Sequence, residues 1–245
     1  MTGYNKYKKT SIDWIEEIPE HWNLMKIGFL FEELSDVSVT GQEDLLSVSQ
    51  YSGIRPKRES IDNEKDNLTN ASSLVGYKSV CKGDLVMNIM LAWNGSLGIS
   101  DFNGIVSPAY CVFRILDPKK YNHKYFHYLF KTEKYKAEFK RSSTGIIESR
   151  LRLYPDKFFV LPAYIPSRRE QDKIVSFLEL KIDQLDKLIN KYETLFGKVG
   201  RKSGLIADYK NALIEEVALG KVDISNIDLG SEHQLVEKLA TNETN

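Results

Sequence analysis

Residues 168–196 read RREQDKIVSFLELKIDQLDKLINKYETLF, and this stretch decides the fold. Apolar side chains recur in it at alternating spacings of three and four, and charged residues fill most of the other positions. So narrow a stripe is typical of a coiled-coil seam, because a helix packed on a compact core presents a wider apolar face. We therefore expect a long helix with another helix beside it. The residues of the expected seam are Val175, Leu178, Ile182, Leu185, Ile189, Tyr192 and Phe196.

The start of this helix carries clear signals. Ser167 follows Pro166 and precedes Glu170 by three positions, which is the spacing of a capping box. A continuous helix over residues 168–218 would be about 75 Å long. Each glycine inside a helix lowers its stability by roughly 1 kcal/mol, so the helix could instead bend or break at the glycines. The glycines concerned are Gly197, Gly200 and Gly204.

The sequence before the helix alternates between strand-like and turn-like text. Strands are expected at residues 45–50, 85–90, 105–106, 109–115 and 158–161, with one or two helices within residues 121–141. Trp14 and Trp22 lie close together near the N-terminus and indicate an anchored lead-in rather than a free tail.

The expected fold class is α+β, a mostly β domain with a few helices followed by a long coiled-coil-forming helix. We expect a β-rich domain with its lead-in at residues 1–165 and a long helix region, suited to pairing with another helix, at residues 166–220. A polar, partly disordered tail is expected at residues 221–245.

Composition narrows the class of protein. No apolar run approaches the roughly 20 residues of a membrane span, and the N-terminus lacks the apolar stretch of a signal peptide. Two cysteines, Cys81 and Cys111, cannot form a disulfide framework and fit a reducing compartment. A cytoplasmic protein is expected.

The formal net charge of zero conceals a segregation of charge along the chain. Residues 12–69 carry 13 acidic and 5 basic side chains, whereas residues 70–165 carry 7 acidic and 14 basic ones. Ten of those basic residues lie between Lys119 and Arg152, against three glutamates. Such a block matches a surface that faces phosphates, although a lysine-rich solvated helix face is an equally open interpretation.

Signatures of catalysis are missing from the sequence. It contains no phosphate-binding loop, no nucleophile elbow, no dinucleotide fingerprint and no adjacent prolines of the kind found in DNA amino-methyltransferases. His123 and His127 have a metal-like spacing, but no second ligand pair lies nearby, so no metal is expected. Glu138 and Lys140 with Asp101 could be taken for a nuclease set, yet a solvated helix face explains them better.

Recognition residues usually lie on loops held by a rigid sheet. The sequence offers three candidate loops. The first follows a Ser-Gly turn at residues 52–53, the second is the turn after Trp93, and the third surrounds Gly145. Trp93 is expected to close the core, and Asn94 is expected to be exposed. Arg150 is the first choice for reading a base, with a structural ion pair to Glu148 as the alternative. The candidate DNA-binding residues are Arg55, Lys57, Arg58, Asn94, Lys136, Lys140, Arg141, Ser143, Thr144, Arg150 and Arg152.

Taken together, these residues resemble the specificity subunits of type I restriction-modification systems. The resemblance covers nearly the whole chain, and the combination is specific although each piece alone is weak. The matching pieces are residues 12–15 with 18–22, residues 82–88, 92–95 and 104–110, Gly145-Ile146 with Arg150-Leu151, residues 166–171 with Ile174, and residues 213–217 with 220–223.

The resemblance implies a role without an active site. Such a subunit recognises double-stranded DNA and recruits modification subunits that methylate adenine and a restriction subunit that cleaves DNA. S-adenosylmethionine, ATP and Mg²⁺ are then expected in the partner subunits, and no cofactor in this chain.

One departure from the family pattern matters. Family members usually carry two recognition domains and two spacer helices, and this chain has room for one of each. We therefore expect a homodimer, paired through antiparallel long helices, that reads a symmetric split site. The alternative is a truncated decoy that binds modification subunits through the helix without recognising DNA.

Overall fold

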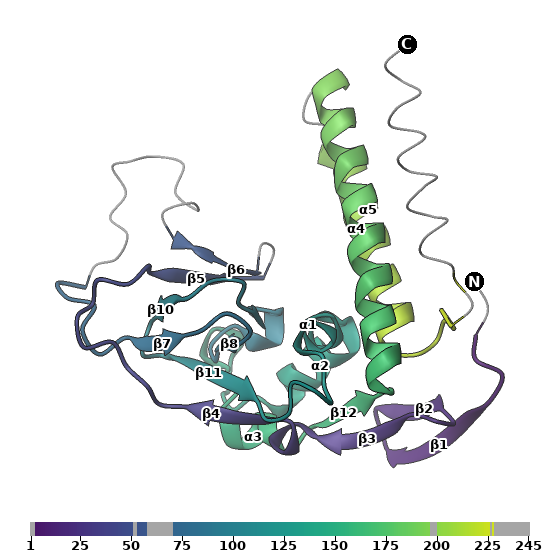
Figure 1. The fold of residues 1–245 in the computed structure, drawn as a ribbon, viewed down its shortest axis with the longest axis horizontal. Coiled ribbons are helices and arrows are strands. Elements are labelled where there is room, and N and C mark those ends of the chain that lie inside the picture. The colour runs from purple at the N-terminus through teal and green to yellow at the C-terminus, as the bar shows by residue number, and fades with distance from the viewer. Residues whose placement is uncertain (1–2, 51–52, 58–70, 197–199, 226, 228–245) are drawn as a thin grey trace. The chain divides into compact units, whose positions relative to one another are not determined.

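The structure is a computed structural model, and it describes residues 3–50, 53–57, 71–196, 200–225 and 227. The chain divides into two compact units, and Figure 1 shows their helices and strands coloured by position along the chain. Residues 23–165 form a β-rich unit, and residues 1–22 with 166–245 form a helical unit. The mixed α+β class expected from the sequence is confirmed. The N-terminal lead-in, which we had placed in the β-rich domain, groups with the helices instead.

The β-rich unit begins with β3 (Asn23–Lys26), η1 (Ile27–Phe29), β4 (Phe31–Leu34), β5 (Leu46–Ser49) and β6 (Gly53–Pro56). Its central strands are β7 (Lys78–Val80), β8 (Leu85–Asn88), β9 (Leu97–Ile99), β10 (Gly104–Val106) and β11 (Tyr110–Ile115), with η3 (Ala92–Asn94) between β8 and β9. Then follow α1 (His123–Lys131), α2 (Glu133–Ser142), η4 (Glu148–Arg150), α3 (Pro155–Phe159) and β12 (Pro162–Ile165).

The main sheet has the antiparallel order β4-β11-β8-β9 and is buried on both faces. Successive residues of a strand point to opposite faces, and β11 shows this directly. Val112 joins an aliphatic cluster on one face, whereas Phe113 packs against Phe158 with ring centroids 5.3 Å apart on the other. Strands β8 and β9 are therefore buried at every position, whereas the edge strand β4 carries the exposed Glu32 and Glu33.

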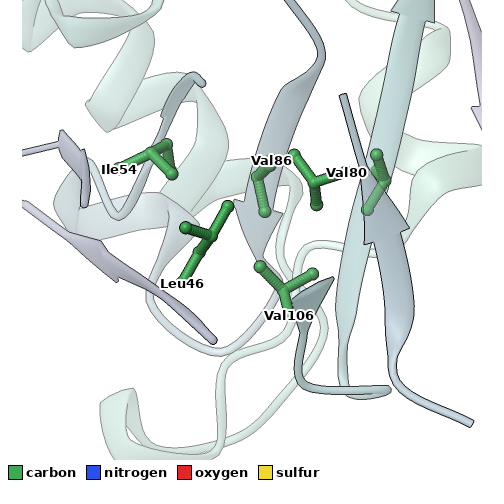
Figure 2. Close-up of a cluster of buried hydrophobic side chains, with 6 residues drawn as sticks. Leu46, Ile54, Val80, Val86 and Val106 are labelled. Carbon is green, nitrogen blue, oxygen red and sulfur yellow. The ribbon is translucent and has the colours of Figure 1, made fainter. Parts of the chain in front are cut away.

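Two clusters form the core of the β-rich unit. The aliphatic cluster joins β5 and β6 to the main sheet, and its buried residues are Leu46, Ile54, Val80, Val86, Val106 and Val112 (Figure 2). The second cluster is aromatic and attaches α1, α2 and α3 to the sheet. Its largest buried rings belong to Phe31, Phe113, Phe126, Phe130, Tyr135, Phe139 and Phe158.

The helical unit contains β1 (Tyr7–Ile12) paired with β2 (Ile15–Pro19), α4 (Arg168–Phe196) and α5 (Gly200–Ala218). α4 and α5 pack against one another (Figure 1), and Lys210 Nζ on α5 lies 2.6 Å from Asp186 Oδ1 on α4. Residues 168–218 therefore form two helices, which confirms the alternative of a break near the glycines. Gly197, the first of these glycines, lies within residues 197–199, which are outside the described residues.

The seam of α4 is partly covered by the same chain. Val175 and Leu178 are buried, and Ile182, Leu185 and Ile189 are half-buried. The side chains of Tyr192 and Phe196 lie outside the described residues. Because α5 packs on α4, part of the seam is shielded from water without a second copy of the chain.

The start of α4 is anchored to the lead-in by Glu170. Ser167 caps the helix, since its Oγ accepts a hydrogen bond from Glu170 N at 3.3 Å. The Glu170 carboxylate does not complete a capping box. It accepts hydrogen bonds from Trp22 Nε1 at 2.9 Å and from the Tyr4 hydroxyl at 2.6 Å, and His21 Nε2 lies 3.1 Å away. The anchored lead-in expected from the tryptophans is confirmed for Trp22, which is fully buried.

Two further expectations meet the structure differently. Residues 158–161 are not a strand, because Pro155 starts the short helix α3 and Phe158 enters the aromatic core. The last strand is β12, which pairs with β3 and has proline at its first position, where no ladder hydrogen bond is lost. Nearly all of the expected polar tail at residues 221–245 lies outside the described residues. Among the helices that are described, none is long and apolar enough to cross a membrane.

Candidate nucleic-acid interface

Two capped helices carry the basic block. Asn122 caps α1 by accepting from Lys124 N, and Thr132 caps α2 by accepting from Tyr135 N. The buried faces of these helices are aromatic, so their cations stay at the other side. We call Lys131, Lys136, Lys140 and Arg141 the cationic ridge.

Lys131 joins three segments of the β-rich unit. Its Nζ donates to Gly95 O at 2.5 Å and to Gln50 O at 3.3 Å, so it ties the end of α1 to the turn after η3 and to the end of the β5 region. Burial and then the neighbouring Lys136 lower the pKa of Lys131 to about 8. In the sequence Lys131 is one cation of the basic block. Its two carbonyl partners are 36 and 81 residues away along the chain, so no local pattern indicates its contacts.

The turn after β8 lies against α2. Trp93 is half-buried, donates from Nε1 to Met90 O at 3.1 Å, and has Lys140 Nζ 5.4 Å from its ring centroid. Asn94 is exposed, as expected. Trp93 therefore holds the turn against the ridge and leaves the Asn94 amide accessible to a partner.

The ridge is less free than the sequence suggested, since three of its cations are ion-paired. Lys136 pairs with Glu133, and Lys140 pairs with Glu148. The Lys140–Glu148 pair is exposed on both sides, and in the other pair Glu133 is exposed while Lys136 is half-buried. Ion pairs at the surface contribute only about 0–1 kcal/mol, so a phosphate can displace the exposed glutamate. These two lysines remain candidates for phosphate contacts.

Arg141 has a different role in the structure. Its guanidinium makes two hydrogen bonds to the Glu138 carboxylate, at 2.7 and 2.8 Å, and Glu138 is only 3% exposed. The interpretation of Glu138 as part of a solvated helix face is therefore wrong. Arg141 neutralises a buried carboxylate, and its loss would leave that charge uncompensated.

The loop around Gly145 is a closed structure. Thr144 and Arg152 exchange both backbone hydrogen bonds, at 2.8 and 2.9 Å, so a single β-bridge closes the loop at its base. Ser143 caps α2 and donates from Oγ to Phe139 O, which fixes the residue before the bridge. Arg152 donates to Leu151 O at 2.8 Å. Residues 144–150 are all exposed.

Arg150 ends η4 inside this loop and is exposed. Arg150 does not form the alternative ion pair with Glu148, because Glu148 pairs with Lys140. The Lys140–Glu148 pair instead links the loop to the cationic ridge. Asn94, the ridge and the Gly145 loop are thus joined by a chain of contacts through Trp93 and Lys140.

The remaining candidates lie apart from these contacts. Arg55 is in strand β6, opposite Ser47, and not on a loop as expected. Lys57 follows β6, and its backbone N–H donates to Leu45 O at 2.7 Å. Arg58 lies outside the described residues.

His127 supports the ridge from beneath and stays neutral. Its Nδ1 accepts a hydrogen bond from Ile99 N at 3.2 Å, so this nitrogen must carry a lone pair. Burial, with Lys131 and Lys124 adding repulsion, lowers the pKa of His127 to about 3. The unfolded chain then takes up a proton below pH 6.5 that the folded chain refuses, and stability falls as the pH drops from 6.5 towards 3.

We expect the free energy of unfolding to fall by about 1.4 kcal/mol per pH unit below pH 6 from this group alone. Urea titrations at pH 7 and pH 5 on the wild type and on His127→Gln measure it. Glutamine can still accept from Ile99 N but does not titrate, so the variant should lose less stability between the two pH values. Equal losses in both proteins would show that His127 does not carry the effect.

Comparisons with known proteins bear on the fold. No protein-family model matches the chain, and no curated protein sequence matches it. The HsdS subunit from Thermoanaerobacter tengcongensis has a similar structure, with a TM-score of 0.50 and 13% identity over 72% of this chain and 46% of that chain. The chain has the fold of an HsdS specificity subunit, the family that its residues resemble.

Two other solved structures give weaker superpositions. One is the S subunit of a type I restriction-modification system from M. genitalium, with a TM-score of 0.44, 15% identity, and coverage of 77% of this chain and 44% of that one. The other belongs to a study of complex assembly and conformational transition in a type I R-M system, with a TM-score of 0.47, 14% identity, and coverage of 86% and 52%. The chain thus spans about half the length of each of these proteins.

Proposed function

We propose that this chain is a DNA-specificity subunit of a type I restriction-modification complex. It binds double-stranded DNA through the β-rich unit and delivers that DNA to modification and restriction subunits. The chain performs no chemistry itself. Adenine methylation with S-adenosylmethionine, and cleavage with ATP and Mg²⁺, would belong to the partner subunits.

The observation that carries the proposal is the link between the cationic ridge and the Gly145 loop on a fold shared with HsdS. The lysines can exchange their exposed carboxylate partners for DNA phosphates. Contacts to phosphates position a protein on DNA without reading its sequence. Asn94 and Arg150 are exposed on turns beside those cations, and these side-chain types pair with adenine and guanine in the major groove. The arrangement thus offers both kinds of contact on one unit.

We further propose that two copies act together, each reading one half of a split site. Leu188 on α4 and Leu205 and Tyr209 on α5 are more than half exposed, which leaves apolar surface on the helical hairpin for another helix. A second copy would supply the second recognition unit, and a two-fold axis would make the site symmetric. The alternative is a decoy, in which this chain binds modification subunits through the same hairpin and does not recognise DNA.

The test is selection from a pool of random DNA duplexes by the complex of this chain with its modification subunits. We expect one enriched motif made of two inverted half-sites. With Arg150→Ala, one base pair in each half-site should lose its preference, by roughly 5- to 150-fold, because a bidentate arginine–guanine contact is worth about 1–3 kcal/mol.

Lys157→Ala is the matched control, since Lys157 is an exposed cation of the same unit on α3. It should leave the motif unchanged. A pool with no enriched sequence would favour the decoy, and an asymmetric motif would contradict the two-copy arrangement. An unaltered motif at normal affinity with Arg150→Ala would remove only that residue from the reading surface.

A further inference from the structure

The tip of the Gly145 loop presents two isoleucines to solvent. Ile146 is fully exposed and Ile147 is 54% exposed, among the four polar or charged side chains of residues 144–150. Exposed single apolar residues are common, but two adjacent ones at the tip of a protruding loop point to a contact.

The loop holds the isoleucines outward. The Thr144–Arg152 backbone pair closes its base, Arg150 N donates to Ile147 O at 2.9 Å, and Leu151 is buried as the return anchor. With both ends tied, the tip cannot fold back to bury Ile146 in the core.

The charges around the tip indicate its partner. Residues 138–152 contain four cationic side chains, Lys140, Arg141, Arg150 and Arg152, and two carboxylates, Glu138 and Glu148. An apolar tip on a cationic base suits a polyanion that displays apolar groups between its phosphates, which is the make-up of duplex DNA. A protein partner with an apolar pocket would not call for this excess of positive charge.

The shape of the loop selects the groove. The loop brings two backbone segments side by side at the Thr144–Arg152 bridge and carries the turn η4 between them. Two backbone segments fit the major groove, which is about 12 Å wide, but not the minor groove of about 6 Å. In the major groove the apolar group on a base edge is the C5-methyl of thymine.

Resting on the proposed function, we propose that Ile146 is a specificity-determining residue that packs on the C5-methyl of a thymine in each half-site. It would select thymine at a position where no hydrogen bond is needed. This adds an apolar reader to the polar candidates Asn94 and Arg150.

The experiment starts from the motif selected by the wild-type complex. Each thymine of that motif is replaced in turn by uracil, which removes only the methyl group, and binding is measured with each duplex. One position per half-site should weaken binding by about fourfold, since burial of one methyl-sized group is worth about 0.8 kcal/mol. The Ile146→Ala complex should bind the thymine and uracil duplexes equally.

Leu116→Ala serves as the control, because Leu116 is another exposed apolar residue of the same unit, 51% exposed and outside the loop. It should keep the wild-type preference for thymine. Both variants should melt with the wild type, as neither removes a buried side chain.

Three results would overturn the inference while leaving the proposed function intact. These are a motif without thymine, uracil duplexes that all bind as well as thymine duplexes, and an Ile146→Ala complex that still discriminates. A random pool that yields no motif would instead overturn the proposed function, and this inference with it.

Discussion

Replacement of Gly145 by alanine is expected to abolish sequence-specific DNA binding while leaving the β-rich unit folded. Gly145 has φ +148°, and an added Cβ would lie 2.5 Å from Arg150 O and 2.8 Å from Arg150 C. These are backbone atoms of the same loop, so the clash can be relieved only by opening the Thr144–Arg152 pair. We expect at least a 100-fold loss of affinity for the selected motif, because Ile146 and Arg150 would lose their positions together.

Gly76→Ala is the control for this prediction. Gly76 also has a positive φ, +83°, but no atom lies within 4 Å of an added Cβ, so the strain is similar without a clash in the loop. Filter binding with the selected duplex, and urea unfolding of both variants, separate binding from stability. If Gly145→Ala bound the motif normally, the loop would not belong to the reading surface.

The second large effect concerns stability. Glu170→Ala should lower the free energy of unfolding of the helical unit by about 3 kcal/mol. Trp22 Nε1 and the Tyr4 hydroxyl would lose their shared acceptor, and each unsatisfied buried donor costs about 1–3 kcal/mol. Glu170→Gln keeps an acceptor oxygen and should lose less.

Glu179→Ala on the exposed side of the same helix is the matched control and should change stability by no more than about 0.5 kcal/mol. Urea unfolding followed by circular dichroism measures these variants, because fluorescence would mix the signals of Trp14, Trp22 and Trp93. A Glu170→Ala protein as stable as the control would mean that the anchor does not hold the lead-in to α4.

Much of the fold could be read from the sequence because local signals agreed with the final packing. Ser167 is an N-cap in text and in structure, and residues 121–141 show helical spacing because their aromatic residues all enter one core. The helix–strand error at residues 158–161 has a physical source. A short apolar run carries no period, and only the contact of Phe158 with rings far along the chain decides its state.

What could not be predicted depends on long-range partners. The seam of α4 shows that a helix must cover it, but a heptad pattern does not say whether that helix belongs to the same chain. Glu170 was assigned to a capping box because its contact with Trp22, 148 residues away, leaves no local signal. For the same reason the sequence predicts a phosphate contact for Arg141 and gives no sign of the contacts that Lys131 makes.

The candidate interface divides in the same way. Exposure of Asn94 and of the Gly145 loop followed from turn chemistry, since loops lie at the surface. The ion pairs that occupy Lys136 and Lys140, and the placement of Arg55 in a strand, required the fold. Ile146 was missed because an isoleucine within a short apolar run is more often buried than exposed.

The most direct test of the account is a map of methylated adenines in cells that express this chain with its modification subunits. The account predicts one methylated motif that is absent when the chain is left out and that loses a base preference in each half-site with Arg150→Ala. Methylation at the same positions with and without the chain, or no methylated motif with an assembled complex, would contradict it.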